Sequence, residues 1–195
     1  MRVIAGSAKG RHLKGPPRKG NRSLARPSSD MVREALFSAL DAVGADLSRV
    51  LDLYAGTGAL GIEALSRGAA WCDFVERDRG MAEVIRKNLR LTGFELRSKV
   101  YPVPAERVLK QLNERYTLIL ADPPYADVAA VGVLEALAAS PLTAEDTIVV
   151  LEHSVRDEPA ASLGPLCLIR VLRHGDSAIS IYCPPGGDPT RVEPC

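Results

Sequence analysis

Residues 49–67 read RVLDLYAGTGALGIEALSR, which is an apolar strand followed by a glycine turn and the beginning of a helix. The turn has the spacing Gly56-x-Gly58-x-x-Gly61. Glycines at the first two positions allow a tight turn and a close approach of the backbone to a ligand. The third glycine allows the helix to pack closely on the strand. This pattern favours the binding of a nucleoside-containing cofactor.

Strands and helices alternate on both sides of this turn. Strands are predicted at 49–54, 72–76, 98–103, 116–121 and 147–151, and helices at 30–43, 59–67, 79–92, 105–115 and 128–139. This alternation predicts an α/β fold with a doubly wound, mostly parallel sheet. Two further strands, 166–174 and 178–182, predict an antiparallel hairpin that adds one strand at the C-terminal edge. Ligands of such sheets bind beyond the carboxyl ends of the strands.

Two acidic residues lie at such strand ends, close to the glycine turn. Glu76 ends the strand that follows the turn, 18 residues beyond Gly58, and a carboxylate there can accept both hydroxyls of a ribose. Asp52 lies four residues before Gly56, where a carboxylate suits a cation such as the ammonium of a methionine moiety and would repel a pyrophosphate. The alternative for Asp52 is a local turn cap.

The tetrapeptide Asp122-Pro123-Pro124-Tyr125 directly follows the buried-type strand 116–121. Two prolines end the strand, so that the Asp122 carboxylate and the Pro123 carbonyl can both accept hydrogen bonds. Tyr125 offers a ring on which a base can stack. These groups suit an exocyclic amino group, because accepting its two N–H bonds localises the nitrogen lone pair and makes it more nucleophilic. The alternative is a proline-rich loop with an ordinary turn aspartate.

The net charge of +1 over 195 residues hides an uneven distribution. Residues 1–26 carry eight Lys or Arg and no acid, whereas the rest carries 17 basic and 24 acidic residues, so charges of +8 and −7 lie on the two parts. A basic arm on an acidic body indicates a polyanionic partner or a solvated tail. We expect a basic N-terminal extension at 1–26, a main domain at 27–183 and a loose tail at 184–195.

Other features limit the classes of protein. The four cysteines (Cys72, Cys167, Cys183 and Cys195) are widely spaced, which predicts free thiols in a reducing compartment and no metal site. No stretch approaches the ~20 apolar residues of a membrane helix. The beginning MRVIAGSAKGRHLK does not have the pattern of a signal peptide. These observations predict a cytoplasmic protein.

The motifs resemble those of known enzymes. Asp-x-x-x-Gly-x-Gly at 52–58 resembles motif I of class I S-adenosylmethionine-dependent methyltransferases, and 122–125 resembles motif IV of amino-methyltransferases. The segments MRVIAGSAKGRHLKGP (1–16), RPSSDMVREALF (26–37) and DLYAGTGALGIEALSRGA (52–69) are similar to the RsmD family. The members of that family methylate the exocyclic amine of one guanine in small-subunit (16S) ribosomal RNA.

The resemblance implies a class I methyltransferase (Rossmann-like) fold that uses S-adenosylmethionine and no metal. The implied cofactor contacts are Asp52, Tyr54, Ala55, Gly56, Gly58, Glu76, Ala105 and Asp122. The implied catalytic residues, which hold and activate the guanine, are Asp122, Pro123 and Tyr125. The implied RNA contacts are Lys9, Arg11, Lys14, Arg18, Lys19, Arg22, Arg26 and Arg33. The partner would be ribosomal RNA in the small subunit or an assembly intermediate. A monomer is the default expectation for a compact enzyme that acts on a large particle.

Three alternatives remain at this point. A DNA adenine amino-methyltransferase shares the tetrapeptide 122–125 but needs a target-recognition region, for which 195 residues leave little room. A nicotinamide-dependent oxidoreductase fits the glycine spacing but leaves that tetrapeptide unexplained. A non-catalytic RNA-binding protein on the same fold would not need Asp122 and Tyr125.

Overall fold

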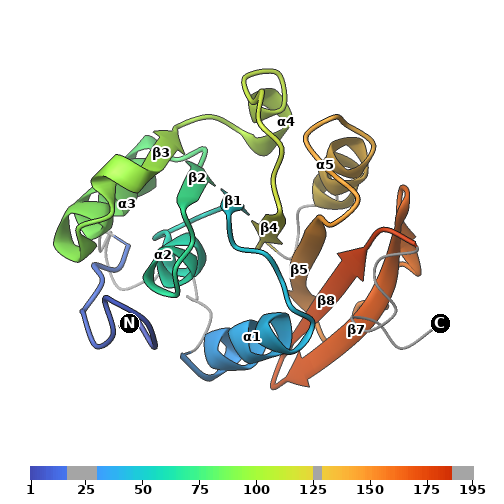
Figure 1. The fold of residues 1–195 in the computed structure, drawn as a ribbon, viewed down its shortest axis with the longest axis horizontal. Coiled ribbons are helices and arrows are strands. Elements are labelled where there is room, and N and C mark those ends of the chain that lie inside the picture. Colours follow the sequence, from blue (N-terminus) through green and yellow to red (C-terminus); the bar gives the residue numbers. More distant parts are fainter. Residues whose placement is uncertain (17–29, 125–128, 186–195) are drawn as a thin grey trace.

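An eight-stranded sheet forms the centre of the computed structural model, which describes residues 1–16, 30–124 and 129–185 (Figure 1). The strand order is β3-β2-β1-β4-β5-β8-β7-β6. The strands are β1 (Arg49–Leu53), β2 (Trp71–Val75), β3 (Ser98–Tyr101), β4 (Leu118–Ala121), β5 (Ile148–Ser154), β6 (Ser162–Leu163), β7 (Leu166–His174) and β8 (Ser177–Cys183). Strands β1 to β5 pair in parallel, and the pairings of β6, β7 and β8 are antiparallel. The predicted fold class is confirmed.

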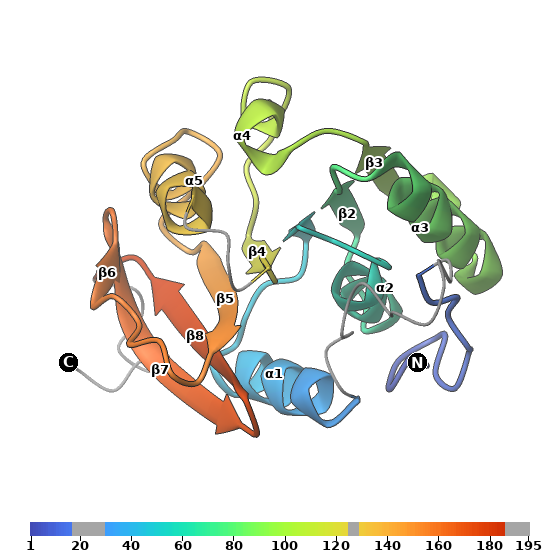
Figure 2. The ribbon, with the colours of Figure 1, turned by 180° about the vertical axis from the view of Figure 1, so that it is seen from behind.

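Helices cover both faces of the sheet (Figures 1 and 2). One layer consists of α1 (Asp30–Ala42), α2 (Ala59–Ser66) and α3 (Arg79–Thr92). The other consists of α4 (Ala105–Val108) and α5 (Ala129–Ala138). A short 3-10 helix, η1 (Glu95–Arg97), connects α3 to β3. This two-sided cover is the doubly wound arrangement that the alternation of elements predicts.

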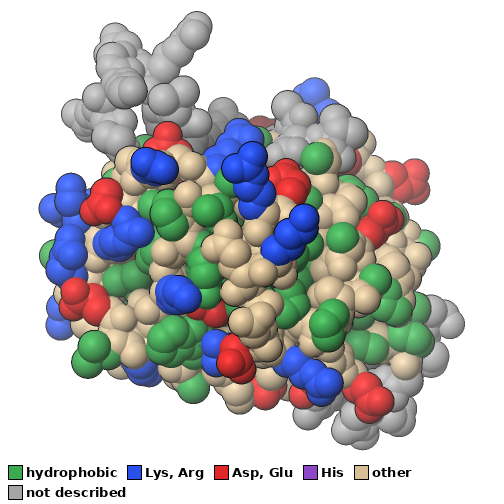
Figure 3. All heavy atoms as spheres, turned by 90° about the horizontal axis from the view of Figure 1, so that it is seen from above, with side chains coloured by type: hydrophobic (Ala, Val, Ile, Leu, Met, Phe, Trp, Pro, Cys, Tyr) green, Lys and Arg blue, Asp and Glu red, His purple; other side chains and the backbone are tan. Residues whose placement is uncertain are grey.

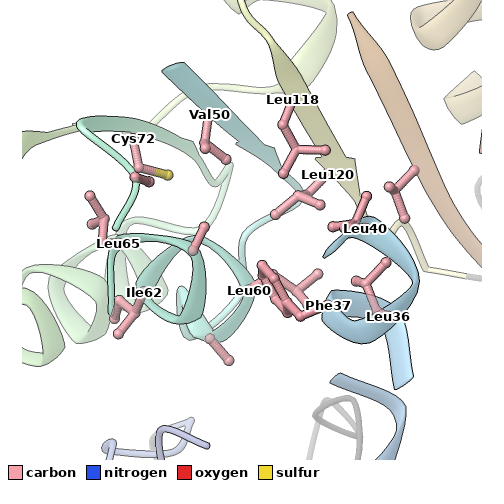
Figure 4. Close-up of a cluster of buried hydrophobic side chains, with 14 of the residues drawn as sticks. Leu36, Phe37, Leu40, Val50, Leu60, Ile62, Leu65, Cys72, Leu118 and Leu120 are labelled. Atoms are coloured by element: carbon pink, nitrogen blue, oxygen red, sulfur yellow. The ribbon is translucent and has the colours of Figure 1, made fainter. Parts of the chain in front are cut away.

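The apolar core has two halves because successive strand residues point to opposite faces of the sheet. Val50 of β1 packs in the half below α1 and α2, and its neighbour Leu51 packs in the half below α4 and α5. Figure 4 shows the first half. There, Phe37 of α1 and Leu60 of α2 lie against the sheet residues, which include Leu118. Full burial of each such side chain contributes about 1.5–3 kcal/mol.

The N-terminal residues pack against the domain as a small hairpin. Arg2 and His12 form an antiparallel bridge, and the Val3 N–H donates to the Arg11 carbonyl at 3.0 Å. The side chains of Val3, Ala8 and Leu13 are buried in the same core half as α1 and α2. This hairpin is therefore an integral part of the core.

The helix expected at 105–115 ends at Val108, so its predicted length was wrong. The Gln111 N–H bonds the Val108 carbonyl at 2.7 Å, which closes a turn. The chain then returns to the sheet, where the Tyr116 N–H donates to the Leu142 carbonyl at 2.8 Å and the Tyr116 hydroxyl donates to Asp73 at 2.7 Å. Tyr116 can make these two hydrogen bonds only because the chain before it is no longer helical.

The hairpin near the C-terminus is present, but the prediction that it adds one antiparallel strand was wrong. Strand β8 pairs with β5, β7 pairs with β8, and β6 pairs with β7. Residues 178–182 of β8 are buried, whereas β7 is largely half-exposed. The second strand of the hairpin therefore occupies the inner position.

The described residues include no helix that is both long enough and apolar enough to cross a bilayer. Most of the loose tail expected at 184–195 lies outside the described residues, as do positions 17–26 of the basic extension.

Candidate active site

Three acidic residues lie at the carboxyl ends of three neighbouring strands of the sheet. Asp52 lies in β1, Glu76 follows β2 and Asp122 follows β4. In the order β2-β1-β4 these strands are adjacent and parallel, so their carboxyl ends meet. The chain passes from β1 to β2 on one side of β1, whereas β4 pairs with β1 on the other side. The carboxyl ends of these strands therefore form the switch point, where ligands of doubly wound sheets bind.

The glycine turn joins β1 to α2 in a compact conformation. The Gly58 N–H donates to the Ala55 carbonyl at 2.7 Å, and the Ala55 N–H donates to the Val75 carbonyl of β2 at 3.0 Å. Gly58 has a φ of 77°, in the left-handed region. Tyr54 has a φ of 57° and is the sole non-glycine residue with positive φ among those that the structure describes. Such a conformation costs about 1–2 kcal/mol and is characteristic of functional turns.

The predicted role of Gly61 in close packing is confirmed. A Cβ atom at this position would lie 2.4 Å from Phe74 and 2.7 Å from the Cys72 sulfur, both in β2. At Gly56, by contrast, an added Cβ would meet no atom closer than 3.9 Å. The first glycine of the turn therefore faces open space, as a backbone that receives a ligand requires.

Glu76 is held by the backbone of the turn. Its Oε2 accepts from the Gly56 N–H at 2.9 Å, and its Oε1 accepts from the Asp78 N–H at 2.8 Å. Each carboxylate oxygen can accept further bonds. Glu76 thus joins the glycine turn to the end of β2 and still has the capacity to accept ribose hydroxyls.

Asp52 is buried, with 1% of its surface exposed. Its Oδ2 accepts from the Gly61 N–H at 2.9 Å, whereas its Oδ1 has no hydrogen-bond partner among the described residues. Burial raises the pKa of Asp52 to about 8; the Gly61 N–H lowers it, and the nearby Asp122 and Glu76 carboxylates raise it. A turn cap explains Oδ2 but leaves Oδ1 unexplained, and a cation at this place would satisfy it.

The Asp-Pro-Pro-Tyr element begins where β4 ends. Asp122 is half-buried and Pro123 is buried, directly after Ala121. Leu53 of β1 pairs with Ala121 of β4, so Asp52 and Asp122 lie at the ends of neighbouring strands. Tyr125 lies outside the described residues. Ala105 is the first residue of α4 and is buried.

The predicted RNA contacts divide into three sets. Lys9, Arg11 and Lys14 are exposed on the N-terminal hairpin and the residues after it. A second set lies outside the described residues: Arg18, Lys19, Arg22 and Arg26. The prediction for Arg33 was wrong, because this residue is 0% exposed, and its guanidinium donates to Asp30 and to the Arg2 carbonyl, both at 2.8 Å. Arg33 fixes α1 to the N-terminal hairpin.

Sequence reasoning missed Asn88, a buried residue of α3 next to the glycine turn. Its Oδ1 accepts from the Lys14 N–H at 2.7 Å. Its Nδ2 donates to the Lys14 carbonyl at 3.1 Å and to the Thr57 carbonyl at 2.9 Å. Asn88 therefore connects the N-terminal segment to the turn. The available signal was a polar residue on the apolar face of α3, beside Ile85 and Leu89.

No group of three or more His, Cys, Asp or Glu within the described ranges could hold a metal ion. The side chains of the candidate site are instead carboxyl groups arranged around a glycine turn. This arrangement can receive a nucleoside, a cation and an amino group that donates hydrogen bonds.

The fold and the site together define an enzyme of the class I methyltransferase type. The chain belongs to the family described as Conserved hypothetical protein 95, whose model matches residues 1–183. The protein YlbH of Bacillus subtilis is 36% identical over 185 residues, which cover 93% of this chain and 98% of that protein. Escherichia coli Ribosomal RNA small subunit methyltransferase D is 33% identical, over 80% of this chain and 76% of its own.

Solved structures agree with this assignment. The Escherichia coli protein yhhF superposes with a TM-score of 0.80 and 30% identity, over 94% of this chain and 97% of that one. A Thermus thermophilus protein superposes with a TM-score of 0.78 and 30% identity. The resemblance to the RsmD family is confirmed, and none of these relatives supports the oxidoreductase alternative.

Proposed function

We propose that this protein transfers a methyl group from S-adenosylmethionine to the exocyclic amino group of a guanine in small-subunit (16S) ribosomal RNA. The observation that carries the proposal is the meeting of Asp52, Glu76 and Asp122 at the ends of three adjacent strands. The name of the Escherichia coli relative, a small-subunit ribosomal RNA methyltransferase, supports the class of substrate.

The residues around the glycine turn fit this cofactor. Asp52 would bind its ammonium group, because Oδ1 is buried without a described partner. Glu76 would bind the ribose hydroxyls while it stays bonded to Gly56. The turn itself (Tyr54, Ala55, Gly56 and Gly58) would line the methionine part, and the Ala105 backbone would lie beside the adenine. When bound, S-adenosylmethionine supplies an electrophilic methyl group.

The Asp122–Tyr125 element would hold the amino group of the guanine. The Asp122 carboxylate and the Pro123 carbonyl accept its two N–H bonds, and Tyr125 stacks on the base. Holding both hydrogens directs the nitrogen lone pair toward the methyl carbon, which raises the nucleophilicity of the nitrogen. S-adenosylmethionine bound here would supply the methyl group, and Asp122 would accept the proton that the methylated nitrogen loses and pass it to solvent.

The basic N-terminal part would bind the RNA backbone. Lys9, Arg11 and Lys14 are exposed, and contacts to phosphates position an RNA without reading its sequence. Arg18, Lys19, Arg22 and Arg26 extend this charge along the chain. The target guanine must leave its stack to reach the carboxyl groups. We propose that the enzyme acts as a monomer in the cytoplasm, on the small subunit or an assembly intermediate.

Replacing Asp122 with alanine tests the proposed role of this carboxylate. We expect Asp122→Ala to lower the rate of methyl transfer at least about 100-fold, the effect of removing a group that stabilises developing charge. The affinity for S-adenosylmethionine, measured by calorimetry, should change little, because Asp52 and Glu76 remain. Asp146→Ala is the matched control, since Asp146 is exposed and precedes β5 at the opposite edge of the sheet. Loss of cofactor affinity in Asp122→Ala, or retained turnover, would contradict this role.

A further inference from the structure

A second basic region of the protein lies outside the N-terminal arm, along α3, η1 and β3. Residues 79–101 contain six Lys or Arg and two Glu, a net charge of +4. Residues 1–16 contribute another +4, with four Lys or Arg and no acid. The complete chain has a charge of only +1, so these two stretches are balanced by an acidic remainder. In Figure 3, Lys and Arg side chains gather along the left edge, the side of α3 and β3.

The two basic stretches adjoin in the folded protein. The Arg11 guanidinium donates to the Leu91 carbonyl at the end of α3, at 2.6 Å. Lys14 is bonded through its backbone to Asn88, in the same turn of α3. Exposed residues Lys87 and Arg90 of α3 therefore continue the exposed charge of the N-terminal hairpin.

A groove opens between α3 and β3 within this basic region. Its volume is about 320 Å³, and its lining includes Arg86, Arg90 and Lys99 together with Ser98 and Glu95. Arg90 and Lys99 are exposed, and Arg86 is half-buried and pairs with Glu83. Strand β3 ends the sheet order, and charged residues on an edge strand protect it from pairing with other chains. Arg90 is exposed beside the groove, and the Lys99 ammonium lies at the edge strand, 4.6 Å from the centre of the Tyr101 ring.

We propose that this groove binds the phosphate backbone of the RNA substrate, so that the RNA contacts extend from the N-terminal hairpin across α3 to β3. The inference rests on the proposed function for the identity of the polyanion. Phosphate oxygens suit this region because the exposed side chains of Arg90 and Lys99 supply positive charge at the rim of the groove. Because such contacts release counterions, the groove contributes a salt-dependent part of the affinity.

A pair of triple variants tests the groove. The groove variant combines three substitutions that remove the cations lining the groove: Arg86→Gln, Arg90→Gln and Lys99→Gln. The matched control is Arg107→Gln, Lys110→Gln, Arg115→Gln, which removes three exposed cations from α4 and the loop after it. Binding of a labelled 16S rRNA transcript is measured by filter binding between about 50 and 200 mM KCl. Thermal unfolding and S-adenosylmethionine affinity are measured in parallel and should match the wild type in both variants.

We expect the groove variant to bind the transcript about tenfold to 100-fold more weakly, and the slope of log K against log salt to fall in magnitude by about 2–3. The control variant should change affinity by less than about threefold. If the groove variant binds the transcript as tightly as the wild type, or if both variants lose the same affinity, the proposed role of the groove is wrong. The proposed reaction would not be affected. A wild type that binds the transcript but never methylates small subunits or their assembly intermediates would contradict the proposed reaction alone, and one without RNA affinity would overturn both.

Discussion

At the scale of single residues, Asp52 carries an energetic cost that the free protein must bear. An unperturbed aspartate has a pKa near 3.8, whereas burial and the neighbouring carboxylates raise the pKa of Asp52 to about 8. Between these values the folded protein keeps the proton that the unfolded chain has released. The free energy of unfolding therefore falls as the pH rises from about 4 to about 8, by at most about 1.4 kcal/mol per pH unit. A cation bound at Oδ1 would reverse the shift.

Replacing Asp52 with asparagine should remove this dependence, because the amide keeps the shape and does not ionise. We predict that the stability of Asp52→Asn relative to the wild type increases steadily with pH between about 5 and 8, as measured by urea unfolding. Asp146→Asn, at an exposed carboxyl, is the control and should show no such trend. If the free energies of unfolding of Asp52→Asn and the wild type differ by a constant amount across this pH range, Asp52 is ionised in the folded protein.

Two roles at the residue scale could not be predicted from the sequence. The resemblance of residues 26–37 to the RsmD family placed Arg33 among the RNA contacts, but Asp30 and the Arg2 carbonyl compensate its burial. Asn88 lies on the apolar face of α3, yet the groups it joins, Lys14 and Thr57, are 74 and 31 residues away along the chain. Such long-range hydrogen bonds leave no local pattern in the sequence.

At the scale of elements, the N-terminal hairpin is held by polar side chains of α2. Buried Glu63 accepts from the N–H groups of Ile4 and Ala5 at 2.8 and 2.9 Å. Ser66 accepts from the Ala8 N–H at 3.0 Å and donates to the Ala5 carbonyl. A buried carboxylate without these donors would be costly, so α2 and the hairpin stabilise each other.

A matched pair of glycines tests this attachment. Gly6 and Gly10 both have positive φ, 79° and 82°, so alanine at either position strains the backbone. An added Cβ at Gly6 would lie 1.8 Å from the Ser66 carbonyl oxygen, whereas at Gly10 it would meet nothing within 4 Å. We predict that Gly10→Ala costs about 1–2 kcal/mol of stability and Gly6→Ala clearly more.

The same pair should differ in proteolysis. In Gly6→Ala the hairpin is displaced from α2, so limited proteolysis should cleave within residues 1–14 faster than in Gly10→Ala. Equal stability and equal cleavage in the two variants would show that the hairpin can shift on α2 at little cost.

The bounds of a helix could be predicted where the sequence contains residues that cap its ends. The bounds of α3 were predicted correctly because Asp78 caps its first turn and Gly93, with a φ of 80°, ends it. The helix after Pro104 has no such terminal glycine, and its length was wrong. The number of antiparallel strands that the hairpin adds was also wrong, because both β8 and β7 join the sheet. The inner place of β8 agrees with its sequence, since 178–182 is largely apolar while 166–174 contains Arg170 and Arg173.

At the scale of the whole molecule, the acidic groups of the site and the basic surfaces occupy different regions. The carboxyl groups of Asp52, Glu76 and Asp122 lie at one sheet edge, and the cations are concentrated on the N-terminal hairpin and along α3 and β3. A polyanion can therefore be attracted by one surface while its target base enters an acidic site that attracts amino groups. The glycine turn and the tetrapeptide predicted the position of the site because they follow strands, whereas the second basic surface depends on folding that brings 1–16 beside 79–101.

Methyl transfer from labelled S-adenosylmethionine to small ribosomal subunits that lack their guanine amino-methylation would test the proposed reaction. The product nucleosides should then be separated and identified. We predict label in N2-methylguanosine with the wild-type protein and none with Asp122→Ala. Label in methyladenosine, or no label on RNA from a protein that binds S-adenosylmethionine, would contradict the proposed function.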